Sequence, residues 1–191
     1  MPSCGQPLPQ CQERRGCGYE ASRLASRDHL EKHDRKAFDC GDSSLNDSLQ
    51  RYACQSHETG AAKTFLAIDN ADDKTILGLY SLAPGALAYA DTPELLRRSL
   101  ARHDVPGIRL ARIATGLRWQ GKGLGGRLLA ATARRCLRAA AEVGCVGFII
   151  DAKNDRAARW SSNYGAVPLS NKALTLVMSL ATFDLKAAGQ L

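Results

Sequence analysis

The sequence lacks any apolar run long enough to cross a membrane. A spanning helix needs about 20 consecutive apolar residues, and no stretch of this chain approaches that length. The N-terminal segment MPSCGQPLPQCQERRGCGYE also lacks the apolar core of a secretory signal. We therefore expect a cytoplasmic protein with no membrane partner.

Cysteine pairs of the kind that bind zinc are missing as well. The seven cysteines are an odd number, and the three in the N-terminal tail are separated by six and five residues rather than the two of a structural zinc site. The four others stand in apolar contexts and are predicted to be small buried thiols: Cys40, Cys54, Cys136 and Cys145. His33 and His57 have no metal partner at a useful spacing, so we interpret them as surface or capping residues and expect no metal.

Positive charge is in excess. The formal net charge is +7 and the sequence pI is about 9.2, which favours acidic partners such as nucleic acid or a phosphate-bearing cofactor. An arginine-rich soluble surface without such a partner explains the same numbers equally well. The length of 191 residues suits a single domain.

Residue periodicity predicts a domain that contains both helices and strands. A first helix, capped by Asp42 or Ser43, carries an apolar stripe along one face. A second helix is expected over 93–103, where Pro93 suits the first helical position. A long helix should end near Val143, and a short one should cover 154–164. Strands are expected at 64–69 and 75–85, which form a hairpin, at 107–115, at 145–152, which should be central and buried, at 173–183, and as a short strand at 86–90.

The ends of the chain differ in composition from this pattern. Residues 1–18 are rich in Pro, Gly, Gln and Cys, and we expect them to be disordered. We place the domain at 30–186, with an N-terminal extension over 1–29 and a short tail over 187–191. Neither internal repeats nor a linker interrupts 38–183.

Four glycines fall within the six residues 121–126, between an expected strand and the long helix. The first amide N–H groups of a helix have no intrahelical partner and attract anions. Glycines let a phosphate approach those amides closely, and Lys122 and Arg127 add positive charge. The stretch therefore predicts a phosphate-binding helix start, with tight packing of the helix against a strand as the purely structural alternative.

Two common phosphate motifs do not fit. Gly121 and Gly126 have the spacing of a Walker A loop, but Arg127 and Leu128 replace its Lys-[Ser/Thr] pair. A dinucleotide fingerprint should open a first βαβ unit and be followed by a suitably placed acidic residue, and neither condition is met.

The segment IATGLRWQGKGLGGRLL resembles motif A of the GCN5-related N-acetyltransferases, [Arg/Gln]-x-x-Gly-x-[Gly/Ala]. The resemblance implies a mixed, mostly antiparallel twisted α/β sheet flanked by helices, and acetyl-CoA as co-substrate. In this family the loop holds the pyrophosphate and the preceding strand pairs with the pantetheine arm. The cofactor residues so implied are Ile113, Ala114, Thr115, Gln120, Gly121, Lys122, Gly123, Leu124, Gly125 and Gly126.

A second family motif, N-x-x-A-x-x-F-Y-x-x-x-G-F, is similar to the segment from Asn154 to Ala166, and Asn154 is added to the cofactor residues on that basis. The segments LEKHDRKAFDCGDSSLNDSL, GLYSLAPGAL and LTLVMSLATF resemble the bacterial toxin branch. That resemblance implies acetylation of charged tRNA, which blocks translation, and inhibition by a ribbon-helix-helix antitoxin. A homodimer is left open.

The family tyrosine, which is thought to protonate the CoA thiolate, is replaced by Ser161. Tyr164 lies one helical turn further along, so either Tyr164 or a water held by Ser161 is the candidate acid, and Tyr164 as a core aromatic is the alternative. On the strand before the loop, Arg109 and Arg112 are candidate contacts to substrate or RNA, whereas Arg97 and Arg98 fit a solvated helix face.

These observations predict an acetyl-CoA-dependent N-acetyltransferase that acts on aminoacyl-tRNA. Two alternatives stay open. One is an acetyltransferase for a small amine or a protein N-terminus. The other is a degenerate acetyl-CoA-binding module, for which Ser161 in place of the tyrosine is the motive.

Overall fold

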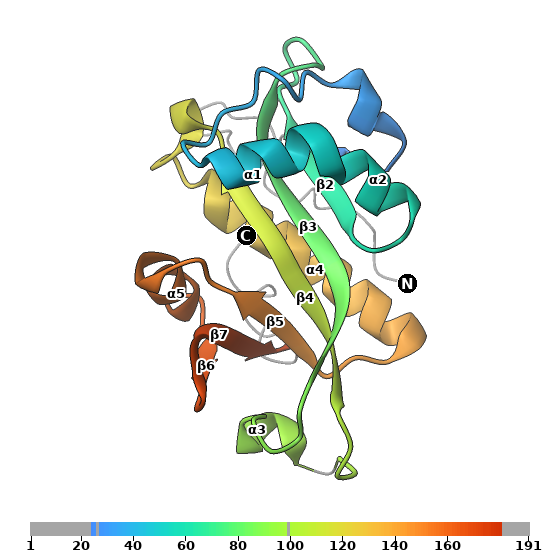
Figure 1. The fold of residues 1–191 in the computed structure, drawn as a ribbon, viewed down its shortest axis with the longest axis vertical. Helices are drawn as coiled ribbons and strands as arrows, with labels where there is room; N and C mark the ends of the chain where they lie inside the picture. Colours follow the sequence, from blue (N-terminus) through green and yellow to red (C-terminus); the bar gives the residue numbers. More distant parts are fainter. Residues whose placement is uncertain (1–23, 26, 99, 181–191) are drawn as a thin grey trace, which may run out of the picture.

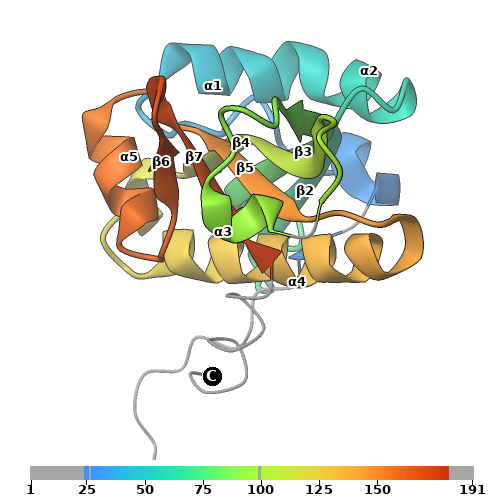
Figure 2. The same ribbon diagram turned by 90° about the horizontal axis from the view of Figure 1, so that it is seen from below.

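The computed structural model describes residues 24–25, 27–98 and 100–180. In this part of the chain seven strands form one sheet between two layers of helix (Figures 1 and 2). Helices α1 (Ser43–Asp47) and α2 (Ala53–Glu58), joined by a π-helical turn, η2 (Ser48–Tyr52), cover one face. The 20-residue helix α4 (Leu124–Val143) covers the other. Short 3₁₀ helices occur at η1 (Arg27–Lys32) and η3 (Leu117–Trp119).

The sheet has the order β1-β2-β3-β4-β5-β7-β6. Its one parallel pair among the described strands is β4 with β5, and the other neighbours run antiparallel. The prediction of a mixed, mostly antiparallel sheet with flanking helices is therefore confirmed. The strands are β1 (Leu24–Ala25), β2 (Lys63–Ile68), β3 (Ile76–Leu87), β4 (Val105–Thr115), β5 (Gly147–Asp151), β6 (Val167–Leu169) and β7 (Lys172–Ser179).

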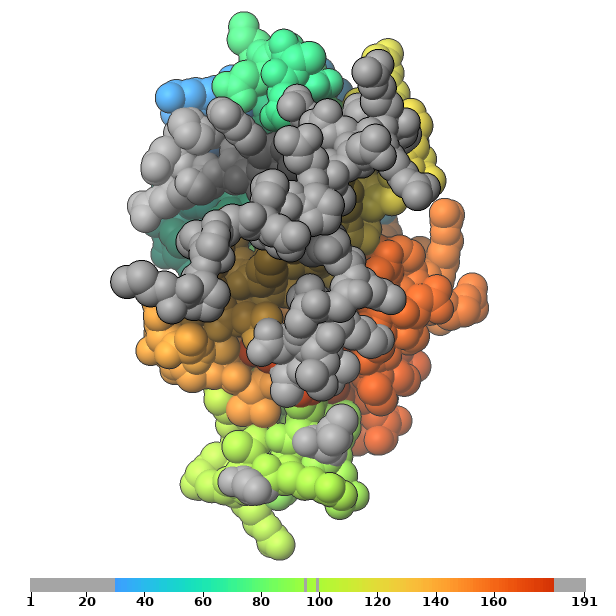
Figure 3. All heavy atoms as spheres, turned by 180° about the vertical axis from the view of Figure 1, so that it is seen from behind, coloured from blue at the N-terminus to red at the C-terminus, as the bar shows by residue number. Residues whose placement is uncertain are grey.

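The two faces of the sheet carry separate cores. Leu128, Leu129 and Cys136 of α4 pack with Phe148 and Ile150 of β5 on one face. The opposite face packs against the α1–α2 layer at its upper end in Figure 1. At its lower end the same face is covered by the segment 88–104 (described except for residue 99), which carries helix α3 (Glu94–Arg97), and Leu96 of α3 packs there with Ile149. This segment extends beyond the rest of the molecule (Figures 1 and 3).

Several predicted elements are confirmed, and their local signals explain why. The 64–69 and 75–85 runs form the β2–β3 hairpin. The continuous apolar run at 145–152 becomes β5, which is central and buried over Gly147–Ile150. Asp42 caps α1, because its side chain accepts from the backbone N–H groups of Ser44 and Leu45. The long helix ends at Val143 as predicted.

Other predictions are wrong in detail. Residues 86–87 continue β3 and do not start a separate strand. The 93–103 helix shrinks to the four residues of α3, and Pro93 is its N-cap with an extended ψ of 143° rather than its first helical residue. The strand β6 was not predicted. Residues 24–25 pair with β2 and 27–32 form η1, so the sheet begins inside the expected 1–29 extension. Residues 1–18 and 187–191 lie outside the described residues.

The interpretation of both histidines as surface or capping residues is wrong. His57 is 2% exposed and its Nδ1 accepts from the Thr64 backbone N–H, while His33 is buried with its Nδ1 3.1 Å from the Asp73 carbonyl oxygen. Among the cysteines, Cys40 and Cys136 are buried as predicted, whereas Cys54 and Cys145 are half-buried. No helix among the described residues combines the length and apolarity needed to span a bilayer.

Candidate acetyl-transfer site

Strands β4 and β5 separate in the middle of the sheet. They pair only from Gly107↔Gly147 to Leu110↔Ile150, although β4 continues to Thr115. A β-bulge lies at the same point, because Arg112 and Leu110 pair with the adjacent residues Ser81 and Leu82 of β3 and leave Ala111 as the extra residue. Bulges bend a strand and increase its twist. The bulge turns the upper half of β4 away from β5 (Figure 1), and we call the place where the backbones of the two strands part the notch.

The predicted pantetheine residues Ile113, Ala114 and Thr115 form the β4 edge of this notch. Two of these side chains pack inside the protein: Ile113 packs on the α4 core and Ala114 packs in the α1–α2 core. What this edge offers a ligand is the polar backbone of β4 beyond its pairing with β5.

The glycine stretch between β4 and α4 divides into two pairs. Gly121 and Gly123 have left-handed φ angles of 74° and 80°, and a Cβ at either position would meet nothing within 4 Å. Both Cβ positions thus open to free space just before the first turn of α4, whose amides have no intrahelical partner and attract anions. We call this glycine loop the cradle, and its binding of the acetyl-CoA pyrophosphate stays a prediction.

The other pair serves close packing. A Cβ on Gly125 would come 3.4 Å from Trp160, and one on Gly126 would come 2.6 Å from the Tyr164 hydroxyl oxygen. The alternative explanation of the glycines, tight packing of the helix start, is therefore correct in part. The packing partner is the α5 region and not a strand. Helix α5 covers Asp155–Ser162, and Trp160 and Tyr164 contact each other with ring centroids 5.0 Å apart.

Side chains of the loop have mixed roles. Lys122 is exposed and lies over the Trp119 ring at 5.1 Å, so its ammonium stays beside the cradle. Arg127 is exposed one turn into α4. Leu124 is buried in the α4 core, which leaves only its backbone N–H for a ligand. Gln120 donates from Nε2 to the carbonyl oxygens of Cys40 (2.9 Å) and Thr115 (3.2 Å).

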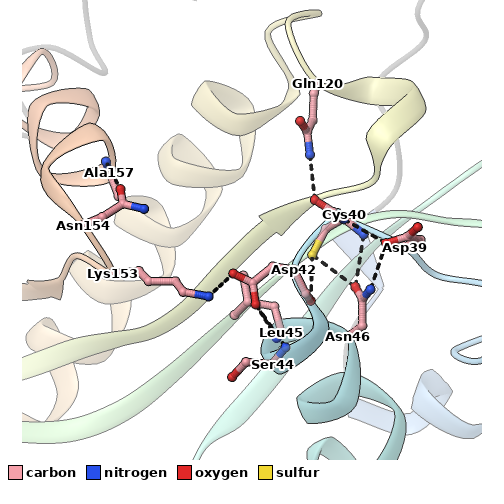
Figure 4. Close-up of polar contacts among 11 residues, drawn as sticks. Asp39, Cys40, Asp42, Ser44, Leu45, Asn46, Gln120, Lys153, Asn154 and Ala157 are labelled. Carbon is pink, nitrogen blue, oxygen red and sulfur yellow. Dashed lines mark hydrogen bonds and ion pairs between the residues drawn. The ribbon is translucent and has the colours of Figure 1, made fainter.

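Gln120 therefore ties the glycine loop to the segment before α1 (Figure 4). In that segment Asp42 forms an ion pair with Lys153, which follows β5, across 111 residues of sequence. The Lys153 hydrogen bond holds the pKa of Asp42 below its ordinary value. Sequence reasoning assigned Asp42 only as a cap and missed Lys153, because nothing local marks a lysine as the partner of so distant a residue.

The two candidate acids lie in different environments. Ser161 is 2% exposed within α5, whereas Tyr164, just after the helix, is 36% exposed with its hydroxyl against the first turn of α4. The structure thus places a phenol at the N-terminal end of α4 and an enclosed alcohol at the position that the family motif gives to tyrosine. Tyr164 is not a buried core residue, so the alternative interpretation of it is wrong as regards burial.

Asn154 has a clear structural role as the N-cap of α5. Its Oδ1 accepts from the Ala157 backbone N–H at 3.0 Å (Figure 4). Binding of the cofactor by Asn154 stays a prediction.

Substituting Asn154 separates these two roles. Asn154→Ala should lower the free energy of unfolding by about 1 kcal/mol, the usual cost of losing a cap, whereas Asn154→Asp keeps a capping oxygen and should keep the stability. If Asn154 also contacts phosphate, the added carboxylate of Asn154→Asp should weaken acetyl-CoA binding. Urea denaturation and calorimetric titration measure the two effects. Equal stability of wild type and Asn154→Ala would contradict the capping role.

The two predicted arginines lie on the sheet face opposite α4. Arg109 forms an ion pair with Asp151 at the end of β5. Arg112 is half-buried and pairs with Ser81, on the same face as Ala114. The solvated-face interpretation of Arg97 is wrong, because Arg97 is half-buried with its guanidinium 5.6 Å from the centre of the Tyr89 ring.

Comparison with known proteins identifies the family, although no family model matches the chain. The chain is 35% identical over 140 residues to the tRNA-acetylating toxin of Mycobacterium tuberculosis (strain ATCC 25618 / H37Rv), a match that covers 73% of this chain and 80% of that protein. The chain belongs to the family of tRNA-acetylating toxins. It is also 26% identical over 159 residues to the probable toxin TacT of Sinorhizobium fredii (strain NBRC 101917 / NGR234), a match that covers 79% of this chain and 87% of that protein.

Solved structures agree with this toxin-family assignment at the level of the fold. A mutant of KacT superposes with a TM-score of 0.80 at 22% identity, over 86% of this chain and 98% of that one. AtaT complexed with acetyl-methionyl-tRNAfMet superposes with a TM-score of 0.78 at 23% identity, over 86% of this chain and 96% of that one. AtaTR bound with acetyl-CoA superposes with a TM-score of 0.73 at 24% identity, over 85% of this chain and 95% of that one. The predicted membership of the toxin branch of the GCN5-related N-acetyltransferases is confirmed.

Proposed function

We propose that this chain transfers the acetyl group of acetyl-CoA to the α-amino group of aminoacyl-tRNA in the cytoplasm, and that it is a toxin held inactive by a ribbon-helix-helix antitoxin. The observation that carries the proposal is the cradle of Gly121 and Gly123 beside the β4–β5 notch. The neighbouring toxins supply the substrate class, since the named relative acetylates tRNA and AtaT was solved with an acetylated charged tRNA.

Each part of the site has a role in this reaction. The first-turn amides of α4 bind the pyrophosphate, with Lys122 beside them. The backbone of β4 from Ile113 to Thr115 orients the pantetheine arm toward the notch. Acetyl-CoA supplies an activated thioester when bound. Tyr164 is the proposed proton donor to the departing thiolate, because its phenol borders the same end of α4.

The segment 88–104 provides the proposed RNA contact. A hollow of about 600 Å³ there has a lining that includes Tyr89, the arginines Arg97, Arg98 and Arg102, and Glu94, which pairs with Arg98. Leu96 packs on the sheet face that also carries Arg109 and Asp151. The arginines of the hollow therefore lie on the face opposite α4. Residues Val105 to Arg109 of β4 span roughly 13 Å at about 3.3 Å per residue. The terminal nucleotides of a charged tRNA can bridge such a span while the phosphates contact the arginines.

Binding of charged tRNA should fall steeply with salt. Contact with several phosphates gives a slope of log K against log[salt] of about −0.7 to −0.9 per phosphate, so affinity should drop by decades between 50 and 200 mM salt if six or more are contacted. Fluorescence anisotropy measures the slope, and replacing both Arg97 and Arg102 with alanine should reduce it by about 2. Arg134 and Arg138, exposed on α4, are the matched control pair. A larger reduction of the salt slope on replacing the control pair with alanine would place the RNA on the α4 face instead.

The activity itself is tested with labelled acetyl-CoA and a pool of charged tRNA, with deacylated tRNA and free amino acids as controls. Acetylation of charged tRNA alone is the expected result. Equal acetylation of free amino acids would favour the small-amine enzyme. Binding of acetyl-CoA without transfer would favour the degenerate module that the buried Ser161 suggests. A short ribbon-helix-helix protein encoded beside this chain should bind it and suppress transfer.

A further inference from the structure

The carboxylate of Asp151 is fixed by two donors where β4 and β5 separate. Its Oδ2 accepts from Arg109 Nη1, and its Oδ1 accepts from the Thr175 hydroxyl at 3.1 Å. These partners come from the two strands on either side of β5, so the contact joins three strands. Asp151 is the residue just after the last β4–β5 pair, Leu110↔Ile150. A held carboxylate therefore marks the base of the notch.

Alternation along β5 shows which face this carboxylate occupies. Phe148 and Ile150 pack in the core beneath α4, whereas Ile149 packs with Leu96 on the other face. Side chains alternate along a strand, so Asp151 points to the same face as Ile149. The first-turn amides of α4 lie on the opposite side of the sheet (Figure 2). A cofactor held by α4 and an acceptor beside Asp151 would meet in the notch from opposite faces.

We propose that Asp151 binds the α-amino group of the acceptor in its protonated form and orients it toward the notch, where the amine attacks the thioester after it has lost that proton to solvent. The inference rests on the proposed function. The side chain is 42% exposed beyond its two contacts, and a carboxylate has lone pairs for more than two donors. Arg109 already balances the charge of Asp151, so the attraction to a cationic amine comes from a direct hydrogen bond to the remaining lone pairs and not from net charge. Arg109 and Thr175 are then positioning residues, because they act through Asp151.

The test compares Asp151→Asn with wild type on two matched probes. One is bulk charged tRNA with free α-amino groups, and the other is the same pool after chemical N-acetylation, which removes the amine charge. Wild type should bind the free-amine pool about 10- to 100-fold more tightly, the size expected for one charge-assisted hydrogen bond of about 1.5–3 kcal/mol. Asp151→Asn, which keeps the shape, should lose that preference and raise the KM for charged tRNA, with acetyl-CoA affinity unchanged.

Two further variants keep the result interpretable. Asp155→Asn removes the same charge from an exposed position at the start of α5 and should leave the preference intact. Arg109→Gln should weaken the preference without changing the salt slope of tRNA binding, because Arg109 then acts through Asp151. A slope that falls by about 1 would make Arg109 a phosphate contact instead.

The outcomes separate this inference from the proposed function. If wild type acetylates charged tRNA but Asp151→Asn keeps the full preference for free amines, the inference is overturned and the proposed function stands. If Asp151→Asn weakens binding of both probes equally, the ion pair with Arg109 is only a structural tie between strands. If wild type does not acetylate charged tRNA at all, the proposed function fails first.

Discussion

Replacing Gly123 with glutamate should abolish acetyl-CoA binding and, with it, acetyl transfer. Gly123 is the N-cap of α4 with a φ of 80°, and nothing lies within 4 Å of a Cβ built there. A glutamate side chain would place its carboxylate in front of the amides that are proposed to hold the pyrophosphate, where like charges repel. Calorimetric titration should show no heat of binding, and acetyl-CoA should no longer raise the Tm.

The backbone strain of this substitution needs a matched control. A non-glycine residue in the left-handed region costs about 1–2 kcal/mol of stability. Gly144→Glu, at the opposite end of α4, is a control with at least as much strain, because Gly144 (φ 76°, ψ 128°) lies outside the αL region that Gly123 occupies. Gly144 has a φ of 76° and is equally free of neighbours within 4 Å. Gly144→Glu should lose stability but bind acetyl-CoA like wild type. Retained binding in Gly123→Glu would show that the cofactor lies elsewhere.

Replacing Tyr164 with phenylalanine should cut kcat by about 10²-fold, the usual size for one general acid. Phenylalanine keeps the ring that contacts Trp160, so a loss reports on the hydroxyl alone. The KM for acetyl-CoA should stay constant, because proton donation to the thiolate acts only in the transition state. Steady-state kinetics with charged tRNA measure both values.

Other outcomes of the Tyr164 experiment are equally informative. A raised KM with constant kcat would make the hydroxyl a contact to the bound cofactor rather than an acid. Full activity would remove Tyr164 as the acid and leave a water at Ser161. The reciprocal change, Ser161→Tyr, inserts a ring at a position that is 2% exposed. It should cost about 1–3 kcal/mol through overpacking, and a gain in turnover despite that cost would show that the notch accepts a phenol from this position.

Local sequence determined much of this protein. The glycine stretch predicted the start of α4, because helix caps and backbone angles depend on adjacent residues. Apolar periodicity predicted the β2–β3 hairpin, the buried strand β5 and the extent of α4 for the same reason. One acetyltransferase motif spans the glycine stretch and the other runs from Asn154 to Ala166, and both are local patterns, so the family could be inferred before the fold was known.

Short segments were predicted less well where local signals are weak. The four residues of α3 owe their position to the packing of Leu96 on Ile149, not to their own helix propensity. His57 stands among polar neighbours in sequence, yet the fold buries it and satisfies its Nδ1 with the Thr64 N–H. Neither burial nor a tertiary hydrogen bond follows from local composition.

Only the tertiary structure decided how the site is assembled. Asp151 meets Arg109 across 42 residues and Asp42 meets Lys153 across 111, and which residues meet depends on strand register and on the bulge at Ala111. A shift of register by one residue would turn Asp151 toward α4 and away from the acceptor face. The sequence by itself therefore determined the glycine loop and the start of α4, which are local. The notch, the held carboxylate and the position of the Tyr164 hydroxyl against Gly126 arise only when distant segments pack together.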